Sequence, residues 1–272
     1  MKKIKQSIIH LLLAIGAFIM VFPFIWMILS SLKTAAEVNS IPPTFFPATP
    51  TLENYTYALE KAPFLIYFRN SVIVTIACVI CTQFTTILAA FAFSRLKFPG
   101  RDLMFSLLLS MMMIPFEMLI ITNYQTIIDW KLTDNLLALI VPFTSSVFYT
   151  YILRNFFLSI PDSLYYSARV DGASNWKYLW RVMVPMAKPA LVTIALLNAI
   201  TCWNSFLWTV LVTNNAEKRT LPFGLYAFMT SSGIRYERLM AAATIVVIPM
   251  ILLFSCFRKE IVTGVSRGGL KG

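Results

Sequence analysis

Residues 163–189 read SLYYSARVDGASNWKYLWRVMVPMAKP and form a polar, basic stretch in an otherwise apolar chain. Apolar runs at residues 135–153 and 190–212 flank it. A helix that crosses a hydrocarbon core of about 30 Å needs roughly 20 residues at about 1.5 Å each, so both runs qualify as membrane spans. The function therefore depends on which side of the membrane this stretch faces and on what it contacts there.

The composition of the 272-residue chain excludes a soluble domain. Hydrophobic residues make up 58% of the chain and charged residues only 13%, whereas soluble domains carry about 25% charged residues. Six apolar runs are long enough to span a membrane, namely residues 8–30, 70–93, 103–123, 135–153, 190–212 and 239–257. The fourth is the weakest, because the hydroxyl residues 144–146 interrupt it. The first is longer than the apolar region of a secretory signal and lacks an A-x-A site, which indicates a retained helix. The predicted fold class is an all-α integral membrane protein with six transmembrane helices.

Lysines and arginines are distributed unevenly between the segments that join these spans. With the N-terminus in the cytoplasm, the inner segments hold 15 of the 23 cations and four acids, whereas the outer segments hold eight cations and seven acids. Cytoplasmic loops of membrane proteins carry such an excess of cations. The net charge of +11 therefore indicates a membrane orientation and not a nucleic-acid-binding surface. Both termini and residues 163–189 are predicted to be cytoplasmic.

Residues that carry catalytic or metal-binding chemistry are scarce. The chain has one histidine, His10, and lacks a phosphate-binding loop of the Gly-Lys-Ser/Thr type. All four cysteines lie in apolar runs, where neither a disulfide framework nor a zinc site is expected; they are Cys78, Cys81, Cys202 and Cys256. The sequence predicts a protein that is not an enzyme and that holds no metal or cofactor.

The stretch between the fourth and fifth spans predicts two short helices joined by a tight turn. Pro161 ends the preceding helix, and Asp162 or Ser163 can cap the next one. The dipeptide Asp171-Gly172 favours a turn because glycine tolerates positive φ, and Ser174 can cap a second, amphipathic helix. Two interpretations stay open on these grounds. Either the second helix lies in the membrane interface, or the pair presents a docking surface to a partner protein.

The same stretch resembles the EAA loop of ABC-importer membrane subunits, whose short coupling helix docks into an ATPase subunit. The matching positions are Ala168, Asp171, Gly172, Ala173, Pro185 and Pro189. Tyr166 and Ser167 replace the signature glutamate and first alanine, so a phenol stands where the family's acid can pair with a cation of the ATPase. The resemblance implies that an ATPase subunit contacts Ser163, Leu164, Tyr165, Tyr166, Ser167, Ala168, Arg169, Asp171, Gly172 and Ala173.

Further motifs extend this resemblance over nearly the whole chain. They are TPTLENY (49–55), LAAFAFSRLKFPGR (88–101), RNFFLSIPDSL (154–164), WNSF (203–206) and GVSRGGLKG (264–272), and together they resemble the second, six-helix permease of maltose/oligosaccharide importers. The resemblance implies a first helix with an external Pro-rich loop (1–66), a five-helix core with a coupling loop at 154–189 (67–258) and a cytoplasmic tail (259–272). It also implies that the tail residues Gly269, Leu270, Lys271 and Gly272 dock between the ATPase subunits.

The resemblance implies a function and a set of partners. The chain is expected to be a permease subunit in the cytoplasmic (inner) membrane that forms half of the pathway of a binding-protein-dependent sugar importer. The expected partners are a second permease, two ATPase subunits that bind ATP and Mg²⁺, an extracellular or periplasmic solute-binding protein, lipid and an oligosaccharide. A permease for a polyamine or a phosphonate is an alternative. An ATPase-independent secondary transporter is a weaker one, because such proteins show inverted repeats and this sequence has none.

Polar and aromatic residues inside the spans are candidates for the transport pathway. Glu117 follows Pro115, which frees backbone carbonyls and can kink the third helix. In a functional role Glu117 accepts hydrogen bonds from sugar hydroxyls or holds a gate. In a structural role it pairs with Arg69 or is protonated, and the structural role is favoured. The other candidates suit sugars because planar amides bond paired hydroxyls and aromatic faces pack on C–H surfaces; they are Asn198, Trp203, Asn204 and Trp208 in the fifth span.

Overall fold

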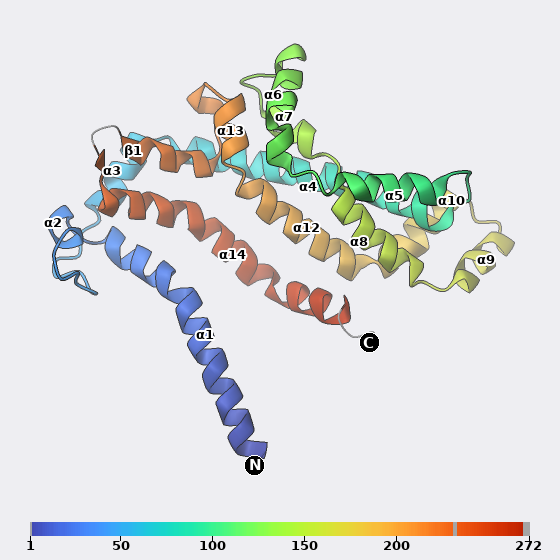
Figure 1. Ribbon diagram of the computed structural model, residues 1–272, viewed down its shortest axis with the longest axis horizontal. Coiled ribbons are helices and arrows are strands. Elements are labelled where there is room, and N and C mark those ends of the chain that lie inside the picture. The colour runs from blue at the N-terminus through green and yellow to red at the C-terminus, as the bar shows by residue number, and fades with distance from the viewer. Residues whose placement is uncertain (1, 231–232, 269–272) are drawn as a thin grey trace. The chain divides into compact units, whose positions relative to one another are not determined.

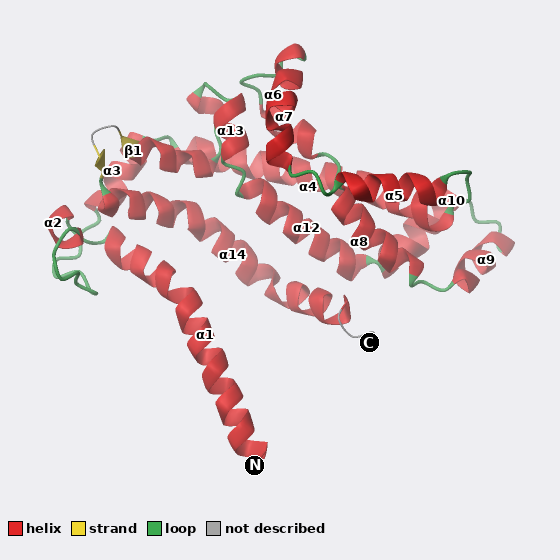
Figure 2. Ribbon diagram, viewed as in Figure 1, coloured by secondary structure: helices red, strands yellow, loops and turns green. Residues whose placement is uncertain are grey.

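The computed structural model describes residues 2–230 and 233–268 (Figure 1). Helices dominate the described residues, and strands occur only at β1 and β2 (Figure 2). The predicted helical class is therefore confirmed. The chain divides into two compact units: the first comprises the residues up to Phe64 together with Pro222–Leu252, and the second comprises Leu65–Leu221 together with the residues from Leu253 onward.

The first unit contains the N-terminal helix and most of the last one. Its elements are α1 (Lys2–Ser31), α2 (Ala35–Val38), α3 (Glu53–Lys61), most of the 3-10 segment η5 (Leu221–Phe228), β1 (Met229–Thr230), β2 (Gly233–Ile234) and the first part of α14 (Tyr236–Gly268). The two strands pair antiparallel, with Met229 opposite Ile234.

The Pro-rich loop after α1 is held by side chains bonded to its backbone. The carboxylate of Glu37 accepts from the backbone N–H groups of Thr34, Ala48 and Thr49, at 3.0, 2.9 and 3.2 Å. These donors, that of Thr34 most strongly, hold the pKa of Glu37 below its usual value. Lys33 is buried, and its ammonium donates to the carbonyl of Thr44. The loop therefore has a defined conformation with little regular structure.

The second unit begins with the longest helix that it contains, α4 (Phe64–Arg95, of which the first residue belongs to the first unit). The following elements are α5 (Arg101–Met111), η1 (Phe116–Leu119), α6 (Ile120–Asp129), α7 (Leu136–Ile140), η2 (Val141–Phe143), α8 (Val147–Leu158), α9 (Asp162–Val170), α10 (Asn175–Tyr178), the π-helical segment η3 (Leu179–Met183), α11 (Val184–Met186), α12 (Lys188–Trp203), α13 (Leu207–Val212) and η4 (Ala216–Lys218).

Three helices are individually long and apolar enough to cross a membrane: Lys5–Ser31, Phe64–Arg95 and Tyr236–Ser255. Three further candidates are bent pairs of helices, and the number of spans reaches six if each pair is one span. The pairs are Arg101–Met111 with Phe116–Asp129, Leu136–Phe143 with Val147–Leu158, and Asn175–Met186 with Lys188–Trp203, bent by 88°, 44° and 77°. The six-span topology therefore stays a prediction.

The third, fourth and fifth predicted runs are not continuous helices, which corrects the sequence analysis. The third breaks between Met111 and Phe116, where Pro115 has extended backbone (φ −62°, ψ 143°) and cannot continue the helix. The fourth breaks at residues 144–146, before Ser146 caps α8 by accepting from Tyr149 N–H. The fifth begins at Lys188 and breaks between Trp203 and Leu207.

Hydroxyl groups of α4 stabilise the break in the fourth run. Thr82 donates to the carbonyl of Phe143 at 2.7 Å, and Thr85 donates to the carbonyl of Thr144 at 2.8 Å. A backbone carbonyl that leaves its helix inside an apolar environment needs such a donor. The polar residues of α4 therefore allow the chain to bend beside them.

Two buried clusters hold the second unit together. One packs α4, α8, η3 and α12 around Leu153, Phe157, Tyr178 and Met183, all of which are 0% exposed. The other packs α4, α6, α7 and α13 around Cys78, Ala138, Trp208 and Val212. The first cluster supports the α9–α10 segment, and the second borders the cavity described below.

Candidate functional site

The helix pair formed by α9 and α10, residues 162–178, is called the elbow here. Its first helix starts at Asp162 directly after Pro161, whose backbone is extended (φ −58°, ψ 137°) and which makes no side-chain cap. The predicted cap by Asp162 or Ser163 is therefore wrong, because both residues are already helical and a cap residue must precede the helix. The carboxylate of Asp162 instead accepts from the guanidinium of Arg95, at the end of α4.

The turn of the elbow follows the Asp171-Gly172 prediction. Gly172 has φ +73°, a left-handed conformation that glycine adopts without strain. Its N–H donates to the carbonyl of Arg169 at 3.1 Å, and the N–H of Ala173 donates to Ala168 at 2.8 Å, which is the bonding pattern of a Schellman cap. Ser174 then caps α10 by accepting from the N–H of Lys177 at 3.2 Å, as predicted.

Aromatic packing fixes the elbow to the rest of the unit. The ring of Tyr165 lies edge-on to that of buried Tyr178, with 5.1 Å between their centroids. The hydroxyl of Tyr165 donates to Oδ1 of Asn175 at 3.0 Å, which bridges the two helices of the elbow. Tyr165 and Ala168 also pack against the cluster around Phe157. The inward side of α9 is thus anchored to the helices behind it.

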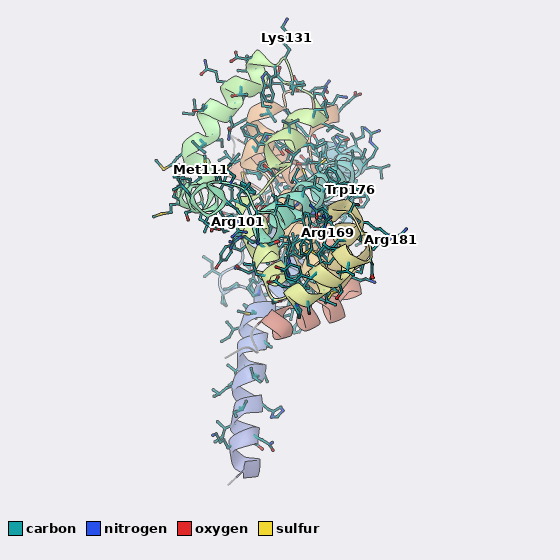
Figure 3. The ribbon with its side chains drawn as sticks, turned by 90° about the vertical axis from the view of Figure 1, so that its right-hand side faces the viewer. Arg101, Met111, Lys131, Arg169, Trp176 and Arg181 are labelled. Carbon is teal, nitrogen blue, oxygen red and sulfur yellow. The ribbon has the colours of Figure 1, made fainter. Side chains whose placement is uncertain are left out.

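The other side of the elbow is exposed and apolar. Tyr166 and Val170 lie one helical turn apart and are 59% and 88% exposed, and Trp176 in α10 is 59% exposed. Arg169 and Arg181 are exposed as well. Figure 3 shows Arg169, Trp176 and Arg181 at one end of the second unit, together with Arg101 at the start of α5, whereas Lys131 lies far from them at the tip of α6. An apolar surface accompanied by guanidinium groups suits a protein partner.

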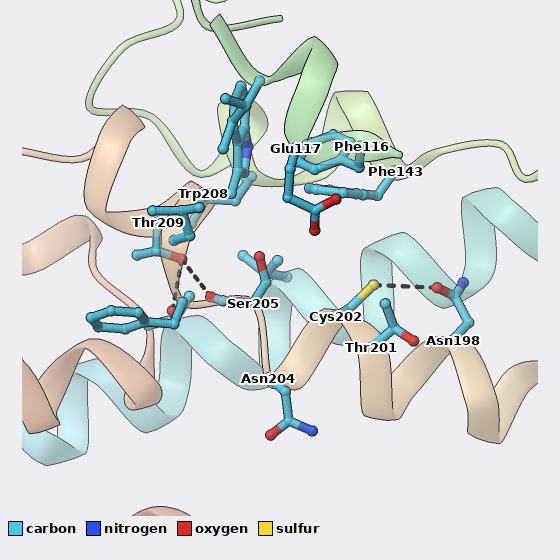
Figure 4. Close-up of a pocket in the computed structure, with 16 residues that line it drawn as sticks. Phe116, Glu117, Phe143, Asn198, Thr201, Cys202, Asn204, Ser205, Trp208 and Thr209 are labelled. Carbon is cyan, nitrogen blue, oxygen red and sulfur yellow. Dashed lines mark hydrogen bonds between the residues drawn. The ribbon is translucent and has the colours of Figure 1, made fainter. Parts of the chain in front are cut away.

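A cavity of about 450 Å³ lies among the broken helices of the second unit (Figure 4). Its lining residues are Val74, Phe116, Glu117, Ile120, Leu139, Phe143, Asn198, Thr201, Cys202, Asn204, Ser205, Phe206, Leu207, Trp208, Thr209 and Thr220. Phe116, Phe143 and Trp208 pack on one another with centroid separations of 5.3, 5.8 and 6.4 Å. The indole N–H of Trp208 donates to the carbonyl of Ala138 at 2.9 Å, which fixes this aromatic wall.

Glu117 lines this cavity, and Figure 4 shows its carboxylate directed into it. The ion pair with Arg69, one of the two structural roles considered for Glu117, is absent from the described residues, and Arg69 donates to Oδ1 of Asn70 at 3.3 Å instead. The 88° bend between α5 and the following helices explains the difference. This bend carries Glu117 to η2 and α13, whereas a straight third helix would have continued past the start of α4.

The candidates in the fifth run divide between the cavity and the core. Asn198 lines the cavity, but its amide oxygen accepts from the Cys202 thiol at 3.3 Å and its amide nitrogen donates to the carbonyl of Cys78 at 3.5 Å. Asn204 also lines it, with its amide on the side of the ribbon opposite Glu117 in Figure 4. Trp203 does not line it and packs edge-on against Phe68, at a centroid distance of 6.0 Å. Trp208 lines it.

Seven hydroxyl-bearing or aromatic lining residues were not among the predicted candidates: Phe116, Phe143, Thr201, Ser205, Phe206, Thr209 and Thr220. Four of them stand next to helix breaks: Phe116 after residues 112–115, Phe143 before residues 144–146, and Ser205 and Phe206 between α12 and α13. Pro115 and the hydroxyls of residues 144–146 were signals for the first two of these breaks. The third break, at residues 204–206, has neither glycine nor proline and left no comparable signal.

Two sequence expectations concern residues beyond these elements. The tail residues Gly269–Gly272 lie outside the described residues. Within the described part of the chain, no three His, Cys, Asp or Glu side chains gather in a group that suits a metal ion, and Cys78, Cys81 and Cys202 are free thiols.

Comparison with known proteins agrees with this architecture. Residues 84–267 match the family described as binding-protein-dependent transport system inner membrane component. The arabinooligosaccharide transport permease AraQ of Halalkalibacterium halodurans is 33% identical, with 100% of both chains covered. The sulfoquinovosyl glycerol transport permease SmoH of Agrobacterium fabrum is also 33% identical, over 92% of this chain and 89% of its own. A crystal structure of a bacterial ABC transporter that imports alginate matches with a TM-score of 0.82 and 25% identity, over 94% of this chain and 96% of that one.

The chain therefore belongs to the family of binding-protein-dependent transport system inner membrane components, the permease subunits of ABC importers. It is a multi-pass protein of the cytoplasmic membrane and a transport subunit, not an enzyme. The hypothesis of a self-contained secondary transporter does not agree with this membership.

Proposed function

We propose that this chain forms half of the translocation pathway of an ATP-driven oligosaccharide importer and that it couples to a separate ATPase through the elbow. The single observation that carries the coupling is the contrast between the two sides of α9. Tyr165 and Ala168 are anchored in the unit, whereas Tyr166 and Val170 present apolar surface to the outside. A rigid helix with one exposed apolar side fits a hydrophobic groove on a partner protein.

The distribution of charge supports a cytoplasmic position for the elbow. Arg101, Arg169 and Arg181 lie at the same end of the second unit as Trp176 (Figure 3), and the cation excess of cytoplasmic loops assigns this end to the inner side. In the resulting topology the chain crosses the membrane six times, both termini are cytoplasmic, and each bent pair is one crossing.

The proposed mechanism follows from how the elbow is attached. Two ATPase subunits that bind ATP and Mg²⁺ close on each other, and the elbow moves with the subunit on which it is docked. Tyr165 transmits this movement to Tyr178, and Asp162 transmits it through Arg95 to α4. The segment Asn175–Met186 joins α12 at a bend of 77°, so a movement of the elbow also changes the tilt of α12. ATP binding thus shifts the population between inward- and outward-facing cavities.

The substrate proposal rests on the relatives and on the cavity. The relatives include permeases named for arabinooligosaccharides and for diacetylchitobiose, the latter from Streptomyces coelicolor with 31% identity. A cavity of about 450 Å³ with an aromatic wall and a few polar groups suits a small ligand of this kind. A second permease completes the pathway, and a solute-binding protein delivers the sugar.

The coupling proposal is tested by placing a charge on the exposed side of α9. Val170→Asp should lower the amount of ATPase that copurifies with the permease pair at least tenfold and should abolish ATP-driven uptake, because a carboxylate replaces an apolar contact. The matched control is Lys131→Asp, which introduces the same side chain at the tip of α6, far from the elbow. Lys131 has φ +56°, a conformation that aspartate tolerates.

The outcomes separate coupling from folding. The proposal is supported if both variants yield as much permease pair as wild type and only Val170→Asp loses the ATPase. If Val170→Asp retains both the ATPase and uptake, the elbow is not the coupling element.

A further inference from the structure

The side chains that line the cavity include none of the cations that would bind an acidic ligand. Among its sixteen lining residues there is one carboxylate, that of Glu117, and there is no lysine, arginine or histidine. The remaining lining side chains are apolar residues, hydroxyls, amides and one thiol. An anionic ligand in this cavity would meet a negative charge and no guanidinium or ammonium group from this chain.

Most polar groups of the lining are already bonded within the protein. The hydroxyl of Thr209 donates to the carbonyl of Ser205 at 2.9 Å and lies 3.0 Å from the hydroxyl of Thr220. The amide of Asn198 bonds to Cys202 and Cys78, and the indole of Trp208 bonds to Ala138. The carboxylate of Glu117 is in no hydrogen bond or ion pair within the part of the chain that the structure describes. The side chains of Asn204 and Ser205 are likewise unbonded within the described residues, but Glu117 is the charged group of this lining that is free to bond a ligand.

We propose that the cavity is a subsite for uncharged sugar residues, in which the carboxylate of Glu117 accepts hydrogen bonds from sugar hydroxyls and disfavours sugars that carry a carboxylate, sulfonate or phosphate. This inference rests on the proposed function and narrows its substrate class. An ionised carboxylate offers two acceptor oxygens, and charge-assisted bonds from hydroxyls are stronger than neutral ones. The wall of Phe116, Phe143 and Trp208 gives the apolar surface against which the C–H face of a sugar ring packs.

The carboxylate of Glu117 also determines the difference in affinity between uncharged and acidic sugars. A second negative charge within a few ångströms of this carboxylate, in a cavity walled largely by apolar side chains, is repelled strongly enough to weaken binding at least tenfold. This repulsion falls with ionic strength to the extent that water enters the site. An uncharged sugar has no such penalty.

The test measures sugar affinity in the purified complex of both permeases and the ATPase, without the solute-binding protein, so that only the membrane site selects. Radiolabelled arabinotriose is the neutral probe and trigalacturonate the acidic probe, each followed by equilibrium dialysis at low and high salt. In the wild type arabinotriose should bind at least tenfold more tightly. Glu117→Gln should reduce the affinity ratio to about threefold or less, and Glu117→Lys should invert it. Met118→Gln, an exposed neighbour that does not line the cavity, should leave the ratio unchanged.

Three results would overturn the subsite: equal affinities in the wild type, a ratio that Glu117→Gln leaves unchanged, or tighter binding of spermidine than of either sugar. ATP-driven uptake of arabinotriose into proteoliposomes, with the binding protein present, separates this failure from that of the proposed function. If uptake proceeds while the affinity ratio does not respond to Glu117, only the subsite is wrong. If the complete importer takes up no sugar, the proposed function is wrong and the inference fails with it.

Discussion

The guanidinium of Arg95 joins the end of α4 to the first turn of α9 by donating to the carboxylate of Asp162. The same group donates to the carbonyls of Phe157 and Ile160, at 2.7 and 2.5 Å. The two partners differ in exposure, because the side chain of Arg95 is 5% exposed and that of Asp162 is 71% exposed. The backbone contacts of Arg95 therefore matter more to stability than its ion pair.

Replacing Arg95 should be far more damaging than replacing Asp162. Arg95→Ala removes a donor from both carbonyls and leaves that of Phe157 with only the N–H of Ile160, so it should lower the free energy of unfolding by about 2–4 kcal/mol. Asp162→Asn removes one solvent-screened ion pair and should cost about 0–1 kcal/mol. Thermal or denaturant unfolding of the purified permease pair measures both. Equal losses in the two variants would mean that the ion pair, and not the backbone contacts, holds the end of α4.

The predicted helices were correct for the first, second and sixth apolar runs. Residues 70–93 lie inside α4, which extends to Phe64 and Arg95, and residues 8–30 lie inside α1. Pro115 and the hydroxyls at 144–146 marked two of the breaks. The size of the bends was not predictable, because it depends on donors from elsewhere in the chain, such as Thr82, which bonds the carbonyl of Phe143.

Those features of the site that depend on residues close together in the sequence were predictable. The turn at Gly172 and the cap at Ser174 depend on neighbouring residues and were predicted. Trp203 and Trp208 were both candidates because they are aromatic residues inside a predicted span. Trp203 packs against Phe68, whereas Trp208 lines the cavity, and this difference depends on which distant helices surround each ring.

Gly224 is a position in the first unit where a side chain would not fit. A Cβ there would lie 2.5 Å from Cε1 and 3.0 Å from Cζ of Phe64, a ring that is 3% exposed. Gly224→Ala should therefore lower the free energy of unfolding by about 1–3 kcal/mol, because a packed ring has to move. The same change in a Phe64→Leu background should cost less, and a double-mutant cycle of unfolding free energies measures the difference. Additive costs would show that the clash is relieved elsewhere.

Asp134 should make the stability of the loop at residues 214–215 depend on pH. Its carboxylate accepts from the backbone N–H groups of Asn215, at 2.7 Å, and Asn214. These bonds hold the pKa of Asp134 below its usual value. Because the folded-state pKa is lowered, the stabilisation is complete above the unfolded-state pKa of about 3.9 and is lost as the pH falls through the folded-state value.

The matching substitution is Asp134→Asn, which keeps the tolerance for the left-handed backbone at this position (φ +58°) but carries no charge. The variant should unfold at a lower temperature than wild type at pH 7, and the two midpoints should converge as the pH is lowered below about 4. Thermal unfolding followed over this pH range tests the prediction. A difference that stays constant with pH would assign the effect to packing and not to charge.

Thr82 and Thr85 should each stabilise the bend beside the cavity through one hydroxyl. Thr82→Val and Thr85→Val preserve the shape of the side chain but remove the donors to the carbonyls of Phe143 and Thr144. Each should lower the free energy of unfolding by about 0.5–2 kcal/mol, within the range of hydrogen bonds between membrane helices. The control is Thr126→Val. The hydroxyl of Thr126 donates to the carbonyl of Thr122 within the same helix, α6, and not to a carbonyl at a helix break. Unfolding of the three variants under one set of conditions measures the contrast, and a loss in Thr126→Val as large as in Thr82→Val would show that the hydroxyls of α4 have no particular role at the bend.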